Sequence, residues 1–346
     1  MLARLAREGL SAPVNLTWEV SLRCNLKCRH CLSAAGDPLQ NELSTQEALD
    51  VLTELAQLHV FQINLGGGEP FLRPDIFQIL GAADRLGIVS CVSTNGTVLH
   101  KEACKKLAQI EGLYLQVSLD GADEATNDRI RGEGTYRQIR KAIENLAMQG
   151  IAFSINTVLT KWSFPQIDTL NAMAREVGAN LRISRFRPSG RGKDSREELA
   201  PDKDQLEWFS HWLNQHRQVL TGDSFFSLTS EKRRNMGLDM CGAAKMTCCL
   251  SPDGSVYPCA FLQEQEFLAG NVRHRSLREI WLNSDIFATF RQMDVRSCEA
   301  CFRFEACRGG CPAVAYHSYG ELGLADPECL VQCQSLQNLR GPGHAV

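Results

Sequence analysis

Strand-like and helix-like segments alternate through the first half of this 346-residue chain. Strands are predicted at 15–22, 61–65, 88–93, 113–119, 151–159 and 181–187, with helices between them at about 44–58, 75–86, 100–110, 136–149 and 164–177. Such alternation is typical of parallel βαβ units. Six strands are too few for a closed eight-stranded barrel, which needs about 250 residues. We therefore predict an α/β fold with a partial, open (β/α)6 barrel of the TIM type over residues 15–187, with its functional residues where the strands end.

A compact group of three cysteines follows the first predicted strand. Cys24, Cys28 and Cys31 are separated by three and then by two residues. Three thiolates are one fewer than the four that normally hold a 4Fe–4S cluster, so one iron would stay open to a ligand that is not protein. A zinc knuckle is the alternative, although zinc usually takes two paired Cys-x2-Cys units.

The other cysteines indicate further metal sites rather than disulfides. Of fifteen cysteines, three lie at 24–31 and ten at 241–333, and only Cys91 and Cys104, which we expect to be small core residues, lie between. Clustered thiols are typical of metal ligands in a reducing compartment. The N-terminus lacks an apolar signal region and no apolar run reaches 18 residues, so we predict a cytoplasmic protein without a membrane partner. A net charge of −3 argues against a nucleic-acid partner.

Glycine-containing segments follow the second, third and fourth strands. They read Gly66-Gly67-Gly68-Glu69-Pro70, Ser93-Thr94-Asn95-Gly96 and Ser118-Leu119-Asp120-Gly121. Glycine lets the backbone approach a ligand closely, although each segment could also be an ordinary strand-to-helix turn. Arg131, in an RGEGTY segment, and Asn156 and Arg185, on the fifth and sixth strands, complete the candidate binding residues. Arg185 suits a carboxylate of the substrate, with a salt bridge to acids of the protein as the alternative.

The chain changes character after the sixth strand. We expect an N-terminal extension at 1–14, a linker with a bridging helix at 188–224, a small loop-rich domain held by metal at 225–335, and a flexible tail at 336–346. The loop-rich domain contains Cys241 and Cys259, then Cys298-x2-Cys301-x5-Cys307-x3-Cys311, and then Cys329. Two structural zinc sites with four thiolates each are the alternative for these cysteines.

The three-cysteine loop, with His30 before its last cysteine, resembles the signature of the radical SAM superfamily. The resemblance implies that Cys24, Cys28 and Cys31 hold a 4Fe–4S cluster whose open iron binds S-adenosylmethionine (SAM), and that SAM is cleaved reductively to a 5′-deoxyadenosyl radical. It also implies that the strand-end segments build the SAM site, with Gly67, Gly68, Glu69 and Pro70 at the SAM amino group and Thr94, Asn95, Ser118 and Asp120 along its ribose and carboxylate side. Arg131, which suits the SAM carboxylate, and the inward-facing candidates Asn156 and Arg185 are added to this set from their residue types and positions.

The second cysteine set resembles the SPASM domain, a C-terminal extension of peptide-modifying radical SAM enzymes. The resemblance implies two auxiliary 4Fe–4S clusters, and hence three clusters in all. The first would be held by Cys241, Cys248, Cys259 and Cys311, and the second by Cys298, Cys301, Cys307 and Cys329. Cys249 and Cys333 stay open as alternatives to Cys248 and Cys329. Clusters closed by four thiolates suit electron transfer.

Longer segments, among them LRISRFRPSGRG, TGDSFF and MCGAAKMTCCLSPDGSVYPCAF, resemble the mycofactocin radical SAM maturases over about residues 15–333. The resemblance implies a ribosomally made precursor peptide ending in Val-Tyr, oxidative decarboxylation of its C-terminal Tyr, and then a carbon–carbon bond between Val and Tyr. A separate small peptide-binding chaperone and an external electron donor are the implied partners. The alternatives are another SPASM maturase, acting on a quinone-cofactor, thioether-peptide or sulfatase substrate, and a non-enzymatic iron–sulfur electron carrier.

Overall fold

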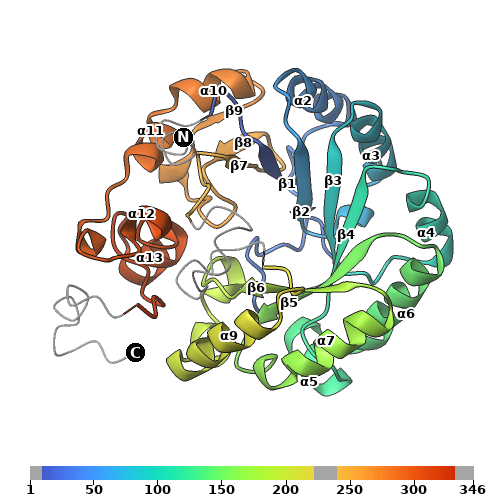
Figure 1. Cartoon of the computed structure of the whole chain (residues 1–346). Coiled ribbons are helices and arrows are strands. Elements are labelled where there is room, and N and C mark those ends of the chain that lie inside the picture. Colours follow the sequence, from blue (N-terminus) through green and yellow to red (C-terminus); the bar gives the residue numbers. More distant parts are fainter. Residues whose placement is uncertain (1–9, 222–239, 332–346) are drawn as a thin grey trace.

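A single curved sheet forms the centre of the computed structural model, which describes residues 10–221 and 240–331 (Figure 1). The sheet has the strand order β6-β5-β4-β3-β2-β1-β7-β8-β9. The strands are β1 Asn15–Ser21, β2 Gln62–Gly67, β3 Val89–Thr94, β4 Leu113–Ser118, β5 Phe153–Leu159, β6 Asn180–Arg185, β7 Thr247–Leu250, β8 Ser255–Tyr257 and β9 Gly270–Asn271. Strands β1 to β6 are parallel to their neighbours. The predicted α/β partial barrel is therefore confirmed.

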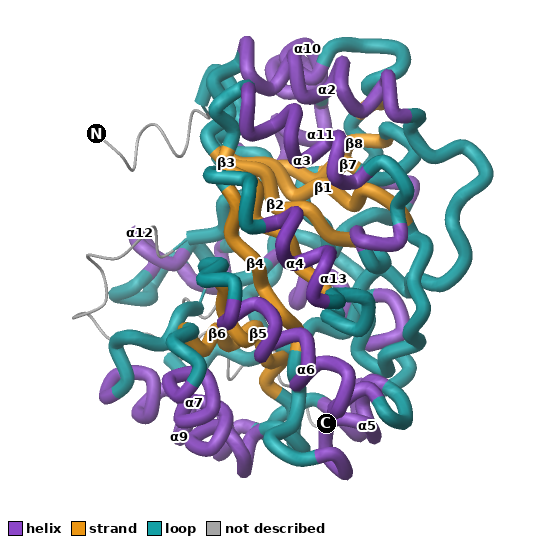
Figure 2. The backbone as a smooth tube through the Cα atoms, turned by 90° about the vertical axis from the view of Figure 1, so that its right-hand side faces the viewer, coloured by secondary structure: helices purple, strands orange, loops and turns teal. Residues whose placement is uncertain are grey.

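The helices of the first half cover the outer side of this sheet (Figures 1 and 2). They are α2 Thr45–Gln57, α3 Ile76–Arg85, α4 Lys101–Leu107, α5 Glu124–Arg131, α6 Thr135–Met148 and α7 Ile167–Glu176. Helix α2 begins as predicted, because the Ser44 side chain accepts from the Glu47 amide and the Glu47 carboxylate accepts from the Ser44 amide. Helix α5 was not predicted, because its sequence EATNDRIR is almost entirely polar.

The strand register separates an outer face from an inner face of the sheet. Neighbours in a parallel pair point to the same face, and successive residues of one strand point to opposite faces. Leu16 of β1 pairs with Ile63 of β2, and both are fully buried in the main apolar core. Thr17 pairs with Asn64 and so belongs to the other, inner face. This alternation decides which strand residues face the interior of the barrel.

The second half continues the sheet rather than standing apart from it. Strand β7 pairs in parallel with β1, and β8 and β9 add antiparallel strands. The helices that follow are α10 Leu277–Asn283, α11 Asp285–Gln292, α12 Phe304–Cys307 and α13 Pro312–Tyr319. The loop-rich expectation missed β7 to β9 because strands of two to four residues are too short to show a periodic pattern.

The segment expected to be a linker is also ordered. It contains a 3-10 turn at Gly190–Gly192, a short helix α8 at Arg196–Leu199 and the predicted bridging helix as α9 Lys203–Gln215. Helix α9 ends earlier than expected, and Leu220 then lies beside β6 in a bridge with Arg182. Within the described ranges, no helix is long and apolar enough to cross a membrane.

Candidate functional site

The loop with Cys24, Cys28 and Cys31 leaves β1 and is closed by two backbone hydrogen bonds. The Cys24 amide donates to the Gly36 carbonyl at 2.8 Å, and the Gly36 amide donates to Leu22 at 2.9 Å. Burial raises the pKa of the Cys28 thiol to about 11; Arg131 opposes this shift, whereas the Cys31 and Cys24 thiols add to it. The three predicted ligands are therefore close enough to influence one another electrostatically.

Donors are directed at the sulfur of Cys24. The Leu26 amide lies 3.5 Å from Cys24 Sγ, and Asn95 Nδ2 lies 3.9 Å from it. Such contacts stabilise a thiolate and tune an iron–sulfur cluster. Among residues 10–221 and 240–331, no three His, Cys, Asp or Glu side chains are arranged as ligands of one metal ion.

The glycine segment at the end of β2 presses against the start of the cysteine loop. Gly67 has φ +100°, and a Cβ there would lie 2.6 Å from the Ser21 carbonyl oxygen. A Cβ on Gly68 would lie 2.2 Å from the Arg23 carbonyl oxygen. Only glycine permits this approach. The amides of Gly68 and Glu69 donate to Ser21 and Arg23 at 2.7 and 2.8 Å, so β2 holds the loop directly.

Glu69 links the ends of β2 and β3. Its fully buried carboxylate accepts from Thr94 Oγ1 at 2.8 Å, from the Asn95 amide at 2.7 Å and from the Phe71 amide at 3.2 Å. Burial raises the pKa of Glu69 to about 7, although these donors oppose the shift. The predicted residues Glu69, Thr94 and Asn95 therefore form one network, and Pro70 begins the 3-10 turn that follows.

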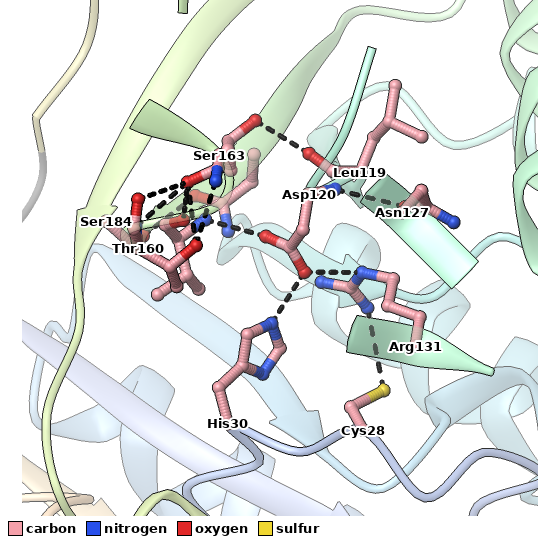
Figure 3. Close-up of polar contacts among 12 residues, drawn as sticks. Cys28, His30, Leu119, Asp120, Asn127, Arg131, Thr160, Ser163 and Ser184 are labelled. Carbon is pink, nitrogen blue, oxygen red and sulfur yellow. Dashed lines mark hydrogen bonds and ion pairs between the residues drawn. The ribbon is translucent and has the colours of Figure 1, made fainter. Parts of the chain in front are cut away.

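Asp120 is the centre of a second network, shown in Figure 3. Its buried carboxylate meets His30 Nε2 at 2.5 Å and Arg131 Nε at 2.7 Å, and it accepts from the Val158 amide at 2.8 Å. Arg131 Nη1 in turn lies 3.9 Å from Cys28 Sγ. Burial alone would raise the pKa of Asp120, but Arg131 and His30 hold it well below its ordinary value. An ionised Asp120 thus orients two cationic or polar groups beside the cysteine loop.

The structure gives Asn156 and Arg185 different surroundings. Asn156 pairs in register with Ser118 and with Arg182 on the inner face, and its Oδ1 accepts from Arg182 Nη1 at 2.9 Å. Arg185 lies outside this row. Its guanidinium is buried in a bidentate ion pair with Asp326, with both N···O distances 2.6 Å. The chain itself therefore supplies a carboxylate, 141 residues further on, which is the salt-bridge alternative that the sequence analysis gave for Arg185.

Arg182 is the inward-facing arginine that the sequence analysis missed. It is half-buried, whereas Arg185 is only 5% exposed. The alternation along β6 contains the signal, because Arg182 and Ser184 share a face and Arg185 takes the other. Without the register between β5 and β6, nothing in the sequence shows which of the two faces points inward.

The second auxiliary cysteine set lines one hollow. Cys298, Cys301, Cys307 and Cys329 all border this hollow, together with Arg303, Phe304 and Asp326. In the first set, burial raises the pKa of Cys259 to about 12, and the thiols of Cys241 and Cys311 raise it further. The Phe261 amide lies 3.5 Å from Cys259 Sγ, so it resembles the donor contact at Cys24. The alternative ligand Cys333 lies outside the described residues.

Cys248 and Cys249 point to opposite faces of β7. Cys248 pairs with Leu16 and therefore faces the helices, where Arg291 of α11 is its charged neighbour. Cys249 pairs with Thr17 on the inner face, near Cys259 and Glu19, which both raise its pKa in addition to burial. Adjacent strand residues cannot face the same side. Cys249 therefore lies on the side of Cys259, whereas Cys248, which the sequence analysis preferred as the ligand, lies on the other side.

The two expected core cysteines differ in their surroundings. Cys104 is fully buried in the main apolar core. Cys91 is buried too, but its Sγ accepts from Gln116 Nε2 at 3.0 Å.

Comparisons with known proteins show the family and the fold. Residues 18–168 match the family model described as the radical SAM superfamily, and residues 241–308 match the SPASM iron–sulfur cluster-binding domain. The chain is 40% identical to the mycofactocin maturase MftC of Mycobacterium tuberculosis, covering 93% of this chain and 84% of MftC. It is 31% identical to the AdoMet-dependent heme synthase of Methanosarcina barkeri, covering 92% and 97% of the two chains. The solved structure of Streptococcus suis SuiB bound to S-adenosylmethionine covers 95% of this chain, with 80% of its own length matched, at 22% identity and a TM-score of 0.77.

The fold, the strand-end networks and the two cysteine sets define a radical SAM enzyme with a C-terminal iron–sulfur cluster-binding domain. SAM and iron–sulfur clusters are the cofactors of this class, and the thiol-only ligand sets with donors aimed at sulfur fit them. Within the class, the chain belongs to the family of mycofactocin maturases. It is therefore a radical SAM enzyme that modifies a peptide.

Proposed function

We propose that the enzyme oxidatively decarboxylates the C-terminal Tyr of a ribosomally made peptide ending in Val-Tyr, and then joins the Val and Tyr remnants by a carbon–carbon bond. The observation that carries this proposal is the 40% identity to mycofactocin maturase MftC over nearly the whole chain. In the first reaction the Tyr residue loses carbon dioxide, one hydrogen atom from Cβ and one further electron, which leaves a double bond between Cα and Cβ.

Three 4Fe–4S clusters would serve this chemistry, each held by one set of cysteines. Cys24, Cys28 and Cys31 would hold the cluster that binds SAM. Cys298, Cys301, Cys307 and Cys329, which border one hollow, would hold the second auxiliary cluster. For the first auxiliary cluster we propose Cys241, Cys259, Cys311 and Cys249 in place of Cys248, because Cys249 shares the inner face with its neighbour Cys259. When bound, these groups supply the radical and the electron-accepting chemistry.

The residues at the strand ends would bind and orient SAM. The backbone at Gly67 and Gly68 would hold the start of the cysteine loop against the end of β2, and Glu69 with Thr94 and Asn95 would keep this strand end rigid beside SAM. Arg131 points its guanidinium toward Cys28, where a carboxylate beside the open iron would meet it. Asp120 keeps Arg131 in that position, and Ser118 and Asn156 share the adjoining row of the inner face.

A separate peptide-binding chaperone and an external electron donor would complete the system. Membership of the mycofactocin maturase family supports a peptide substrate. A second solved structure of SuiB, bound to its precursor peptide SuiA, has a TM-score of 0.78 to this chain. The likeness shows a shared fold. The chaperone and the donor rest on the family resemblance, and binding and reduction assays with purified candidates would test each of them.

The proposed function is tested by an anaerobic assay of the reconstituted protein with dithionite, SAM and a synthetic peptide ending in Val-Tyr, with and without a candidate chaperone. Mass spectrometry should show a peptide lighter by carbon dioxide and two hydrogens, and 5′-deoxyadenosine should form. The matched control replaces Cys24, Cys28 and Cys31 together by Ala, which should abolish both products. SAM cleavage with an unchanged peptide would overturn the substrate but keep the class. No SAM cleavage at all would favour an iron–sulfur electron carrier.

A further inference from the structure

The eight residues 185–192, RFRPSGRG, form a segment that the proposed chemistry leaves without a role. We call it the bridging segment. It begins with the last residue of β6 and ends in the turn Gly190–Gly192. Residues 185–189 are all buried, including the two arginines Arg185 and Arg187. Buried arginines in a strand-to-helix connection are costly unless each has a defined partner.

Arg191 holds the loop that contains Cys24, Cys28 and Cys31. Its Nε donates to the Cys28 carbonyl at 2.9 Å, and its backbone amide donates to the Cys31 carbonyl at 3.0 Å. Its Nη1 donates to the Ala35 carbonyl at 2.8 Å. One residue thus fixes the backbone of this loop at three points, two of them at cysteines.

Gly190 makes this contact possible. It has φ +52°, and a Cβ there would lie 2.3 Å from the Leu32 carbonyl oxygen and 2.5 Å from that of Cys31. No residue with a side chain could bring Arg191 so close to the loop without moving backbone. The bridging segment and the cysteine loop are therefore in direct backbone contact.

Arg185 holds the loops of both auxiliary cysteine sets through Asp326. The Arg185 guanidinium makes the bidentate pair with Asp326 and a further contact of 2.7 Å with Glu328. Asp326 Oδ2 also accepts from the Cys311 amide at 3.0 Å, and the Asp326 carbonyl accepts from the Cys329 amide at 3.1 Å. Asp326 thus contacts one cysteine from each auxiliary set, and Arg185 fixes Asp326.

Arg187, between these two anchors, lies against the loop of Cys259. Its guanidinium carbon lies 3.9 Å above the ring of Phe261, whose amide donates to Cys259 Sγ. Three arginines of one short backbone segment therefore reach three loops that are far apart in the sequence. In Figure 1 the helices α12 and α13 lie on the open side of the curved sheet, where β7 is above and β6 is below.

We propose that the bridging segment is a positioning element that keeps the SAM-site loop and the two auxiliary loops at fixed separations. The proposal rests on the cluster assignments made above. Electron transfer and hydrogen abstraction both depend steeply on distance, and a misplacement of about 1 Å can cost about 10²-fold in rate. Arg191 would govern SAM cleavage, whereas Arg185 would govern how much peptide is oxidised for each SAM cleaved.

The test compares Arg191→Gln, Arg185→Gln and Asp326→Asn in the full-length reconstituted protein. The readouts are iron per chain, electron paramagnetic resonance of the reduced protein with and without SAM, and the ratio of decarboxylated peptide to 5′-deoxyadenosine. Arg191→Gln should weaken the SAM-induced spectral change and slow SAM cleavage at least about tenfold, with the auxiliary signals kept. Arg185→Gln should continue to form 5′-deoxyadenosine, but its product ratio should fall at least about fivefold and its auxiliary signals should change.

The control is Arg137→Gln, which breaks an exposed pair with Glu124 and should leave every readout unchanged. Arg185→Gln combined with Asp326→Asn should be no worse than Arg185→Gln alone, because Arg185→Gln already removes the ion pair that Asp326→Asn breaks. Arg185→Lys, which keeps the charge but loses the bidentate fork, should also lower the ratio and serves if Arg185→Gln does not fold. The proposal is overturned if the Arg185 variants give the same product ratio and the same auxiliary signals as Arg137→Gln. If the parent protein leaves the peptide unchanged, the substrate assignment fails, while the iron and spectral measurements still decide the role of the segment.

Discussion

Replacing Cys249 by Ala should empty the first auxiliary site, whereas replacing its neighbour Cys248 should not. The two residues are a matched pair, because they are adjacent in β7 and no more than 1% exposed. In cluster-free protein each replacement removes one small buried thiol, at a similar cost of about 1 kcal/mol. They differ in face: Cys248 shares the outer face with Leu16, and Cys249 shares the inner face with Thr17.

The size of the difference follows from the cluster count. Three 4Fe–4S clusters bring about twelve iron atoms per chain, so Cys249→Ala should retain about eight and Cys248→Ala about twelve. Iron and acid-labile sulfide are measured after anaerobic reconstitution, with the thermal unfolding of the cluster-free variants as the control for folding. Loss of about four iron atoms from Cys248→Ala, with none lost from Cys249→Ala, would refute the argument from strand register. Equal losses from both would refute it as well.

Three further outcomes are expected from the strand-end networks. Asp120→Asn removes the buried carboxylate charge beside His30 and Arg131. The free energy of unfolding of the cluster-free protein, measured in urea, should fall by about 3–5 kcal/mol, and a fall below about 1 kcal/mol would contradict the buried network. Gly68→Ala brings a Cβ to 2.2 Å from the Arg23 carbonyl oxygen, so it should weaken SAM binding at least about tenfold in titration calorimetry. The control Gly36→Ala, whose Cβ would have no atom within 4 Å, should bind SAM normally. Burial raises the pKa of Glu69 from 4.5 to about 7, so the folded protein binds this proton more tightly than the unfolded chain does. The contribution of Glu69 to the free energy of unfolding is therefore full below about pH 4.5 and falls by about 3 kcal/mol as the pH rises to about 7. Glu69→Gln should remove that pH dependence, and parallel curves for the two proteins would show that Glu69 does not titrate in this range.

The elements that could be predicted from sequence are those whose signals are local. The strands β1 to β6 and most of their helices follow from periodicity, and the Ser44 capping box follows from two residues three apart. The three-cysteine loop and the glycine segment could be found because each lies within a few residues. Through their resemblance to known families, these local signals were enough to predict the class of enzyme.

The features that the sequence did not reveal depend on contacts between distant residues. The Arg185–Asp326 pair joins positions 141 residues apart, and no local pattern indicates it. Cys248 and Cys249 are equivalent in spacing, and only the register of β7 against β1 tells them apart. Helix α5 was missed because its residues are polar, although its last residue Arg131 is one of the predicted site residues. In each case tertiary packing decides what a local pattern leaves open.

Strand β1 is shared by two of the cysteine sites, which explains why the second half continues the sheet. Its C-terminal end leads into the loop with Cys24, and its flank pairs with β7, which carries Cys249. Between them lies the buried Glu19 of β1. Its carboxylate accepts hydrogen bonds from Ser33 of the cysteine loop and from Gln263 of the auxiliary region. A slip of one residue between β1 and β7 would turn Cys249 away from Cys259 and turn Cys248 inward. The pairing of β7 with β1 therefore decides which thiol can serve the first auxiliary site, while the bridging segment fixes the same loops from the other edge of the barrel.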